Sequence, residues 1–339
     1  MTAAEIAKIA GVSRSTVTRV MNNYPDTAEE TRRKVLEVVE KYGYAPNASA
    51  RSLVGKKAKE IGLFIHYAAD DISQSVYFGS LITHVIDCAE HHDYSVLTSI
   101  IKPGQRGKIS HFLNNESIQG AIVTGGAMEK KEALNLMESR HKIVVVDLVS
   151  YDSDLQDYCG LVNRDNFKGG YLATEYLIKH GHREIMHIAG ALSRVSGAER
   201  LRGYETALQD HGIKLSKKLI LKGDFSDATA EKLLEKYLKH HKPPTAIFAG
   251  NDMSAIGAMR VLKAKGYVIP KDVSIVGFDD IYFAKELEPK LTTISSPPKT
   301  IATTAVETLI KMIEIRDFRV SKTVIGVSLI ERESVKMIS

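Results

Sequence analysis

The stretch IAKIAGVSRSTVTRVMNN, residues 6–23, decides the fold of the N-terminal segment. Its apolar residues recur at helical spacing on both sides of a break at Gly11-Val12-Ser13, which predicts two short helices. Gly11 suits the left-handed end of the first helix, and Ser13 can cap the second by accepting a backbone N–H. Two helices joined by a tight turn form the motif that places a second helix in the major groove of DNA.

The outward face of the second helix is polar and basic. Val17, Val20 and Met21 are expected to point inward. The residues left to contact DNA are Arg14, Ser15, Thr16, Thr18, Arg19 and Asn22. An arginine can donate two hydrogen bonds to guanine, and short polar side chains suit phosphate contacts. The alternative is an ordinary amphipathic pair of helices whose arginines are solvated surface charges.

A third helix follows this pair. The segment Thr27-Ala28-Glu29-Glu30 predicts a capping box at its start, and Gly43 predicts its end. The residues expected to be buried are Ile6, Ala7, Ile9 and Ala10 in the first helix and Val35, Leu36, Val38, Val39 and Tyr42 in the third. Because the turn, the caps and the third helix agree, the pattern favours a folded DNA-binding headpiece.

The net charge is segregated along the chain. Residues 1–59 hold 11 Lys and Arg against 6 Asp and Glu, whereas the whole chain holds 46 against 41. The remaining 280 residues therefore carry 35 charges of each sign and are neutral. A basic segment on a neutral body is typical of a small module that binds phosphates, joined to a domain with another task.

The composition excludes several classes of protein. With 339 residues and 44% apolar content, the chain can form two or three domains with buried cores. No apolar run approaches the roughly 20 residues of a membrane helix, and residues 1–5 lack the pattern of a signal peptide. Cys88 and Cys159 form no metal-type pair, which fits a reducing compartment. We therefore expect a cytoplasmic, nucleoid-associated protein with no membrane contact, no metal and no cofactor.

Residues 47–59 predict a hinge and a linker. Asn47 could cap a short helix that is too small to be stable alone, and a basic linker follows it. The phrase at residues 6–23, the phrase TAEETRRKVLEVVEKYGYAPNASARSL at 27–53 and IVGFDD at 275–280 resemble the lactose/galactose repressor family of bacterial transcription factors. The resemblance extends over nearly the full length.

The resemblance implies roles in DNA binding. In that family the residues matching Arg14, Ser15 and Arg19 read bases. The hinge residues matching Asn47 to Leu53, Arg51 among them, fold on operator DNA. The leucine matching Leu53 wedges into the minor groove, where unstacking is exchanged for a bent duplex. The alternative is a linker leucine packed on the body.

A homodimer is expected, because two headpieces that read a pseudo-palindromic operator require two-fold symmetry. No leucine-heptad tail follows residues 328–335, so the tetramerising coiled coil of the family is not expected.

Apolar strands alternate with amphipathic helices after Lys59. The expected strands are 61–65, 95–100, 120–123 and 143–147 in a first series, and 184–189, 245–249 and 273–277 in a second. This pattern predicts an α/β core of two doubly wound parallel lobes, which the resemblance likens to periplasmic sugar-binding proteins. The expected domains are a headpiece at 1–46, the hinge and linker at 47–59, and a core at 60–339. The N-lobe is expected at about 60–162 and 292–322, and the C-lobe at about 163–291 and 323–339.

The resemblance also implies an effector site in the cleft between the lobes. The residues that match its contact positions are Tyr77, Phe78, Asp147, Arg194, Ser196, Arg200, Phe225, Asn251 and Asp279. Arginine donors and aspartate acceptors can clamp neighbouring hydroxyls, while aromatic faces cover the apolar side of a sugar or base. Two alternatives stay open: Phe225 as a core residue and Arg194 as a surface charge.

Arg164 departs from the commonest family pattern, in which this position is small or uncharged. It lies in the segment Asn163–Asn166, where the second lobe is expected to begin. If Arg164, Arg194 and Arg200 all face the ligand, their field favours a carboxylate or phosphate. Alternatively, Arg164 pairs with Asp165, Asp147 or another acid.

These features predict a ligand-responsive, sequence-specific transcription repressor of a carbohydrate-utilisation operon, with a sugar or sugar derivative as effector. A purine-type corepressor-dependent regulator is the rival within this class, and a cytoplasmic sugar-binding protein is the rival outside it. An enzyme is disfavoured, because GxGxxG after a strand, GxxxxGK[ST], HExxH and GxSxG are all missing. The adjacent carboxylates Asp279 and Asp280 are expected to diverge.

Overall fold

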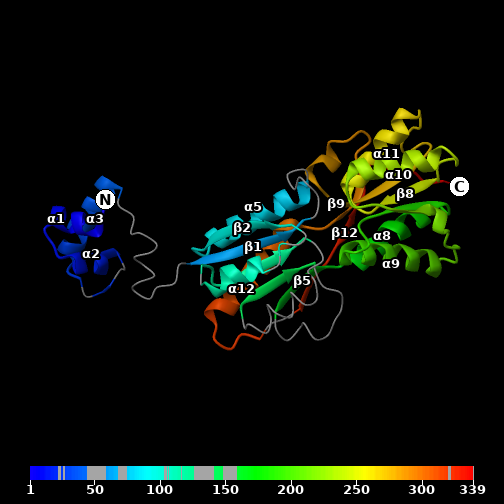
Figure 1. Ribbon diagram of the computed structural model, residues 1–339. Coiled ribbons are helices and arrows are strands. Elements are labelled where there is room, and N and C mark those ends of the chain that lie inside the picture. Colours follow the sequence, from blue (N-terminus) through cyan, green and yellow to red (C-terminus); the bar gives the residue numbers. More distant parts are fainter. Residues whose placement is uncertain are drawn as a thin grey trace. The chain divides into compact units, whose positions relative to one another are not determined.

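In the computed structural model the chain forms two compact units, Met1–Ala58 and Lys59–Ser339 (Figure 1). The structure describes residues 1–21, 24–25, 27–43, 59–67, 75–102, 105, 107–115, 117–125, 141–147, 159–319 and 322–338. Four residues expected to bind DNA, Asn22, Asn47, Arg51 and Leu53, lie outside these ranges.

The headpiece contains the three expected helices. They are α1 (Ala3–Ala10), α2 (Arg14–Met21) and α3 (Glu29–Tyr42). Gly11 ends α1 with a left-handed φ of 67°, and the Ser13 hydroxyl accepts the Thr16 N–H at 3.1 Å, so both expected caps are confirmed. Ile6, Val17 and Val35, one from each helix, are buried together at the centre.

The expected capping box of α3 is wrong. The helix begins at Glu29, so Ala28 precedes it and offers no side-chain acceptor. Thr27 Oγ1 is buried without a partner among the described residues, and Glu30 pairs with Lys34 at 2.8 Å instead.

The buried stripe is also narrower than expected. Ile9, Leu36 and Tyr42 are 47%, 44% and 46% exposed. Val35 is fully buried, and Val38 and Val39 pack against the same cluster. Each of these short helices buries only the side chains that lie three or four positions apart on its inner face. Leu36 lies to the side of the inner face of α3 and stays exposed.

Two six-stranded sheets form the core (Figure 1). The first has the order β11-β5-β4-β3-β1-β2, and the second β12-β10-β9-β8-β6-β7. All described pairs are parallel except β10 with β12. The first sheet comprises β1 (Glu60–His66), β2 (Ser95–Ile101), β3 (Ala121–Thr124), β4 (Ile143–Val146), β5 (Gly160–Arg164) and β11 (Lys322–Ile325). The second comprises β6 (Ile185–Ala189), β7 (Ile220–Lys222), β8 (Ala246–Ala249), β9 (Ser274–Asp279), β10 (Thr292–Ser295) and β12 (Ser328–Ile330).

Helices cover both faces of each sheet, which confirms the doubly wound α/β fold. The helices of the first lobe are α5 (Val76–Glu90), α6 (Lys108–Asn114) and α12 (Pro298–Glu314). Those of the second are α8 (Asn166–Lys179), α9 (Val195–Asp210), α10 (Asp227–Leu238) and α11 (Asp252–Ala264), with short turns η3 (Lys217–Leu219) and η4 (Tyr282–Lys285). In the first lobe α5 and α12 pack on one face and α6 on the other. In the second lobe, α10 and α11 pack on one face of the sheet, and α8 and α9 pack on the other.

The chain crosses between the lobes slightly later than expected. Strand β5 continues the first sheet to Arg164, and β10 continues the second to Ser295. The last crossing falls between Ile325 in β11 and Ser328 in β12. The expected boundaries after residues 162, 291 and 322 are therefore too early, because each strand completes its sheet before the chain leaves it. Arg164 ends the first sheet rather than beginning the second lobe.

Candidate functional site

Three aspartates at the carboxyl ends of central strands have left-handed backbones. Asp147 follows β4 with φ 52°, Asp279 ends β9 with φ 114°, and Asp280 follows it with φ 55°. Such conformations cost free energy in non-glycine residues and concentrate at functional sites. Ligands of doubly wound sheets also bind beyond the carboxyl ends of the strands. Both observations place the candidate site at the carboxyl ends of the central strands of the two sheets.

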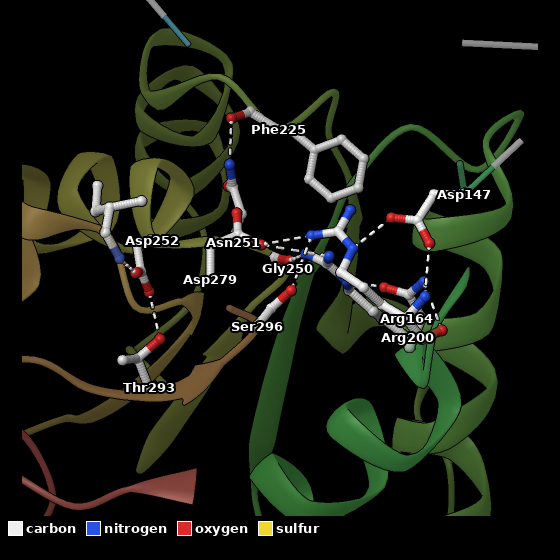
Figure 2. A network of polar contacts seen from close by, with 12 residues as sticks. Asp147, Arg164, Arg200, Phe225, Gly250, Asn251, Asp252, Asp279, Thr293 and Ser296 are labelled. Atoms are coloured by element: carbon white, nitrogen blue, oxygen red, sulfur yellow. Dashed lines mark hydrogen bonds and ion pairs between the residues drawn. The ribbon is translucent and has the colours of Figure 1, made fainter. Parts of the chain in front are cut away.

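Arg164 connects these edges (Figure 2). Its backbone N–H donates to Asp147 Oδ1 at 2.8 Å, and its Nε donates to Asp147 Oδ2. Its Nη1 donates to Asp279 Oδ1 and to Ser296 Oγ, each at 3.2 Å. The guanidinium carbon lies 4.4 Å from the centre of the Tyr77 ring. Of the readings left open by the sequence, the structure shows the pairing of Arg164 with Asp147 and adds a second carboxylate.

Arg200, from α9, approaches the same carboxylate. Its Nη2 donates to Asp279 Oδ1 at 3.4 Å, its Nε to Asn166 Oδ1 at 3.0 Å, and its Nη1 to the Gly250 carbonyl at 2.5 Å. The guanidinium carbon lies 3.5 Å from the centre of the Phe278 ring. Every nitrogen of this side chain is therefore engaged, and only 2% of the side chain is exposed.

Burial and the oppositely charged neighbours shift the pKa values of this cluster in opposite directions. Burial raises the pKa of the Asp279 carboxyl, and Arg200 and Arg164 oppose that rise. Burial lowers the pKa of Arg200 to about 10, so this arginine stays charged at neutral pH. Burial also disfavours the charge of Arg164, but Asp147 and its other neighbours outweigh that effect and raise its pKa. Two cations thus share one buried carboxylate.

Phe225 and Asn251 lie beside Arg200 (Figure 2). Asn251 caps α11 through the Ser254 N–H at 3.0 Å, and its Nδ2 donates to the Phe225 carbonyl at 3.0 Å. Phe225 has a left-handed φ of 76°, and its ring centre lies 5.5 Å from the Arg200 guanidinium carbon. A Cβ at Gly190 would lie 2.0 Å from this ring, so the glycine allows the ring its position. Asn251 was expected to contact the ligand, and its side-chain amide here holds the backbone of Phe225.

Tyr77 and Phe78 lie in the first turn of α5 and form an aromatic row with Tyr67. The ring centres are 5.6 Å apart for Tyr67 and Phe78, and 5.4 Å apart for Tyr77 and Phe78. Phe78 packs in the core of the first lobe, whereas Tyr77 carries the Arg164 guanidinium on its ring. The Tyr77 hydroxyl is buried without a partner among the described residues.

Arg194 and Ser196 lie at the start of α9. Arg194 precedes the helix, and its guanidinium carbon is 5.9 Å from the centre of the Tyr67 ring. Ser196 is buried in the first turn. The structure thus brings together Asp147, Arg164, Arg200 and Asp279 directly, with Tyr77 and Phe225 against the arginines. Arg194 meets the other end of the aromatic row.

The sequence did not indicate the residues that brace the Asp279-Asp280 turn. Asp252 Oδ2 accepts the Ile281 N–H at 2.9 Å, and its Oδ1 accepts the Thr293 hydroxyl at 2.5 Å. Burial raises the pKa of Asp252 to about 8. Asp280 turns away from Asp279 and accepts from Arg332 Nη2 at 2.6 Å, which confirms that the two carboxylates diverge. The adjacent Asn251-Asp252, directly after a buried strand, was the available signal for this brace.

The candidate DNA-contact residues in the described headpiece lie on α2. Arg14, Ser15 and Arg19 are exposed, and Thr16 and Thr18 are half-buried. The Thr18 hydroxyl donates to the Arg14 carbonyl at 3.1 Å, and the Arg19 guanidinium carbon lies 5.4 Å from the Tyr24 ring centre. The two arginines therefore stand on the solvent side of the helix.

The described ranges contain no cluster of three or more His, Cys, Asp and Glu side chains that could hold a metal ion. In the same ranges, every helix is too short or too polar to span a membrane.

Two protein-family models match the chain. The model of bacterial regulatory proteins of the lacI family matches residues 2–47, and that of a periplasmic binding protein-like domain matches residues 174–335. The probable HTH-type transcriptional repressor ExuR of Bacillus subtilis (strain 168) is 31% identical, over 100% of this chain and 99% of its own length.

Two solved structures of transcription regulators are similar to this chain over nearly its full length. The Lac repressor dimer bound to operator and the anti-inducer ONPF has a TM-score of 0.86 at 25% identity, covering 99% of each chain. The complex of the transcriptional regulator CelR with cellobiose has a TM-score of 0.75 at 26% identity, covering 98% of this chain and 99% of that one. These regulators share both the headpiece and the two-lobed core with this chain.

Proposed function

The chain belongs to the lacI family of bacterial regulatory proteins, and we propose that the cluster of Arg164, Arg200 and Asp279 binds its effector. The protein is a ligand-responsive, DNA-binding transcription repressor. Its effector is a sugar or sugar derivative, and its targets are genes of carbohydrate use. Support for this class comes from the complex of the transcriptional regulator CelR with cellobiose, to which this chain is similar.

One observation carries the proposal: Asp279, at the end of a central strand of the second sheet, is shared by Arg164 from the first sheet and Arg200 from α9. Among the described residues, neither Asp279 Oδ2 nor Arg164 Nη2 takes part in a hydrogen bond, so the cluster keeps one acceptor and one donor for a ligand. Vicinal sugar hydroxyls can satisfy such a pair, because each hydroxyl both donates and accepts. The rings of Tyr77 and Phe225 supply apolar faces.

The same contacts can couple effector binding to DNA binding. Arg164 links the two sheets through Asp279 and Ser296, so a ligand that changes these hydrogen bonds changes how the lobes are held. An effector acts only through the difference in its affinity for the DNA-competent and DNA-incompetent states. The headpiece would then bind a pseudo-palindromic operator as part of a homodimer, with Arg14, Ser15 and Arg19 reading bases.

A thermal-shift screen of the purified full chain against neutral sugars, sugar acids, hypoxanthine and guanine tests the effector class. A ligand present at 100 times its Kd stabilises the protein by about 2.7 kcal/mol. We expect a sugar to raise the melting temperature and to alter binding to an operator selected from random DNA. Stabilisation by purines alone would favour the purine-type rival, and failure to select any DNA sequence would favour a plain sugar-binding protein.

A further inference from the structure

We propose that the second lobe carries a further DNA-binding surface, which holds the phosphate backbone of a duplex without reading its sequence. The surface is the edge of the second sheet at which β6, β7, β8 and β9 begin. It comprises the connections from a helix to the strand that follows it, residues 180–184, 211–219, 239–245 and 265–273, and is called the amino edge below. The candidate effector site lies at the other ends of the strands.

The charge of the core is unevenly distributed although its sum is zero. The amino edge holds eight lysines and arginines against two acidic residues, Glu184 and Asp272. The eight basic residues are Arg183, Lys214, Lys217, Lys218, Lys239, Lys242, Lys265 and Lys271. The connections at the opposite edge of the same strands, residues 190–194, 223–226, 250–251 and 280–281, together hold one basic and two acidic residues. Positive charge is therefore concentrated at one end of the lobe.

The fold brings the four connections side by side. Their strands are parallel neighbours in the order β9-β8-β6-β7. The Thr245 N–H donates to the Glu184 carbonyl at 3.2 Å, and the Ser274 N–H donates to the Thr245 carbonyl at 3.0 Å. Four strands about 4.8 Å apart form a row about 14 Å long. One DNA strand places a phosphate about every 3.4 Å, so the row matches about four successive phosphates.

The basic side chains of the amino edge are available to a partner. All eight are exposed, and none of them forms an ion pair with a described residue. Asp272 is partly engaged, because its Oδ2 accepts the Val268 N–H at 2.7 Å. The surface therefore presents an excess of uncompensated positive charge to solvent.

Compensation of helix dipoles accounts for only part of this charge. Lys239 and Lys265 directly follow α10 and α11, where a cation is favoured. Lys214, Lys217 and Lys271 lie at least four residues beyond the end of the preceding helix. The dipole effect fades within the last turn, so it does not explain these lysines.

The residue types favour duplex DNA over other polyanions. Seven of the eight basic residues are lysines, which suit phosphate contacts and lack the bidentate fork that reads guanine. Interfaces with proteins are depleted in lysine and enriched in aromatic residues and arginine. Single-stranded nucleic acids stack their bases on aromatic side chains. The amino edge has one aromatic residue of the Phe, Tyr and Trp class, the half-buried Tyr267.

Fluorescence anisotropy of a labelled duplex of random sequence tests the proposal. The duplex is titrated with the full chain, to which an equimolar amount of unlabelled operator per dimer is already bound, so that the headpieces are occupied. If about four lysines contact phosphates, the affinity should fall about a hundredfold between about 50 and about 200 mM salt. K217E/K218E/K239E/K242E should bind the random duplex at least about tenfold more weakly at the lower salt concentration, and each lost contact should reduce the salt slope by about 1. Its operator affinity should stay close to that of the wild type.

The matched control is K142E/K168E/K222E/K299E, which reverses four exposed lysines outside the amino edge. It changes the net charge of the chain by the same amount, and we expect it to bind the random duplex within about threefold of the wild type. If the reversed amino-edge variant does not fold, as judged by far-UV circular dichroism, the neutralised K217Q/K218Q/K239Q/K242Q decides, since it should also lose affinity.

Several results would overturn the proposal. Absence of binding by the operator-loaded wild type at low salt would reject the surface. Equal losses in the amino-edge variant and in the control would leave only the general effect of net charge. Tighter binding of a labelled single strand than of the duplex would assign the surface to a different nucleic acid. Binding of a labelled poly-glutamate peptide without binding of the duplex would indicate an acidic protein as partner instead.

Discussion

Replacing Arg200 with Met is the perturbation whose effect can be worked out most fully. Methionine keeps a long unbranched side chain but removes the charge and the three hydrogen bonds to Asn166, Gly250 and Asp279. Removing one partner of a buried ion pair costs about 3–5 kcal/mol. Because Arg164 still pairs with Asp279, we expect the lower end, a loss of about 3 kcal/mol in the free energy of unfolding of the core.

The pH dependence of this loss follows from Asp279. Burial already raises the pKa of its carboxyl above the ordinary value, and Arg200 is the stronger of the two cations that oppose that rise. The pKa of Asp279 should therefore rise further in Arg200→Met. A carboxyl whose folded pKa exceeds its unfolded pKa stabilises the fold at low pH, and this contribution is lost as pH rises through the folded pKa. The deficit of Arg200→Met should accordingly be larger at about pH 8 than at about pH 5.

Urea unfolding of the full chain, followed by far-UV circular dichroism at both pH values, measures the deficit. Arg202→Met is the matched control on the same helix, because Arg202 pairs with Glu199 at the surface, where such pairs contribute about 0–1 kcal/mol. The reasoning is refuted if Arg200→Met is no less stable than Arg202→Met, or if its deficit is the same at both pH values.

Three further predictions concern the DNA contacts and the brace of the Asp279-Asp280 turn. Arg19→Ala should weaken operator binding by about 1–3 kcal/mol in a gel-shift titration and affect random DNA much less; equal losses on both would make Arg19 a phosphate contact. Leu53→Ser should reduce operator bending in a gel-phasing assay, and unchanged bending would reject the wedge. Burial raises the pKa of Asp252 from its ordinary value of 3.8 to about 8, so the core should lose stability as the pH rises between these two values. Thermal unfolding of Asp252→Asn should show a weaker decline over this range, and an unchanged decline would contradict that assignment.

The sequence was sufficient for the elements that rest on local pattern. Strands such as β1 and β4 are runs of apolar residues buried on both faces, so their positions were evident from the sequence. The caps at Gly11 and Ser13 were also correct, because each depends on residues a few positions apart. The lobe boundaries were displaced because β5 ends on Asn163 and Arg164, polar residues that read as the start of a loop.

The candidate site was harder to assemble from the sequence. Residue types suggested that Arg200 and Asp279 lie near each other, but the partner of Arg164 remained open, since Asp147 and Asp279 are distant from it along the chain. The brace formed by Asp252 was missed because its partners are distant along the chain: Ile281 lies just after β9, and Thr293 lies within β10. Leu36 was expected inside because hydrophobicity alone does not reveal how narrow a face three short helices cover.

The most direct test of the central claim measures operator affinity of the full chain with and without its effector, in the wild type and in Asp279→Asn. Effectors change the affinity of a second ligand by about 5–150-fold in typical coupled systems. The account predicts such a change in the wild type, and in Asp279→Asn an operator affinity close to that of the wild type that no longer responds to the effector. A response in Asp279→Asn as large as that of the wild type would contradict the placement of the effector at Asp279.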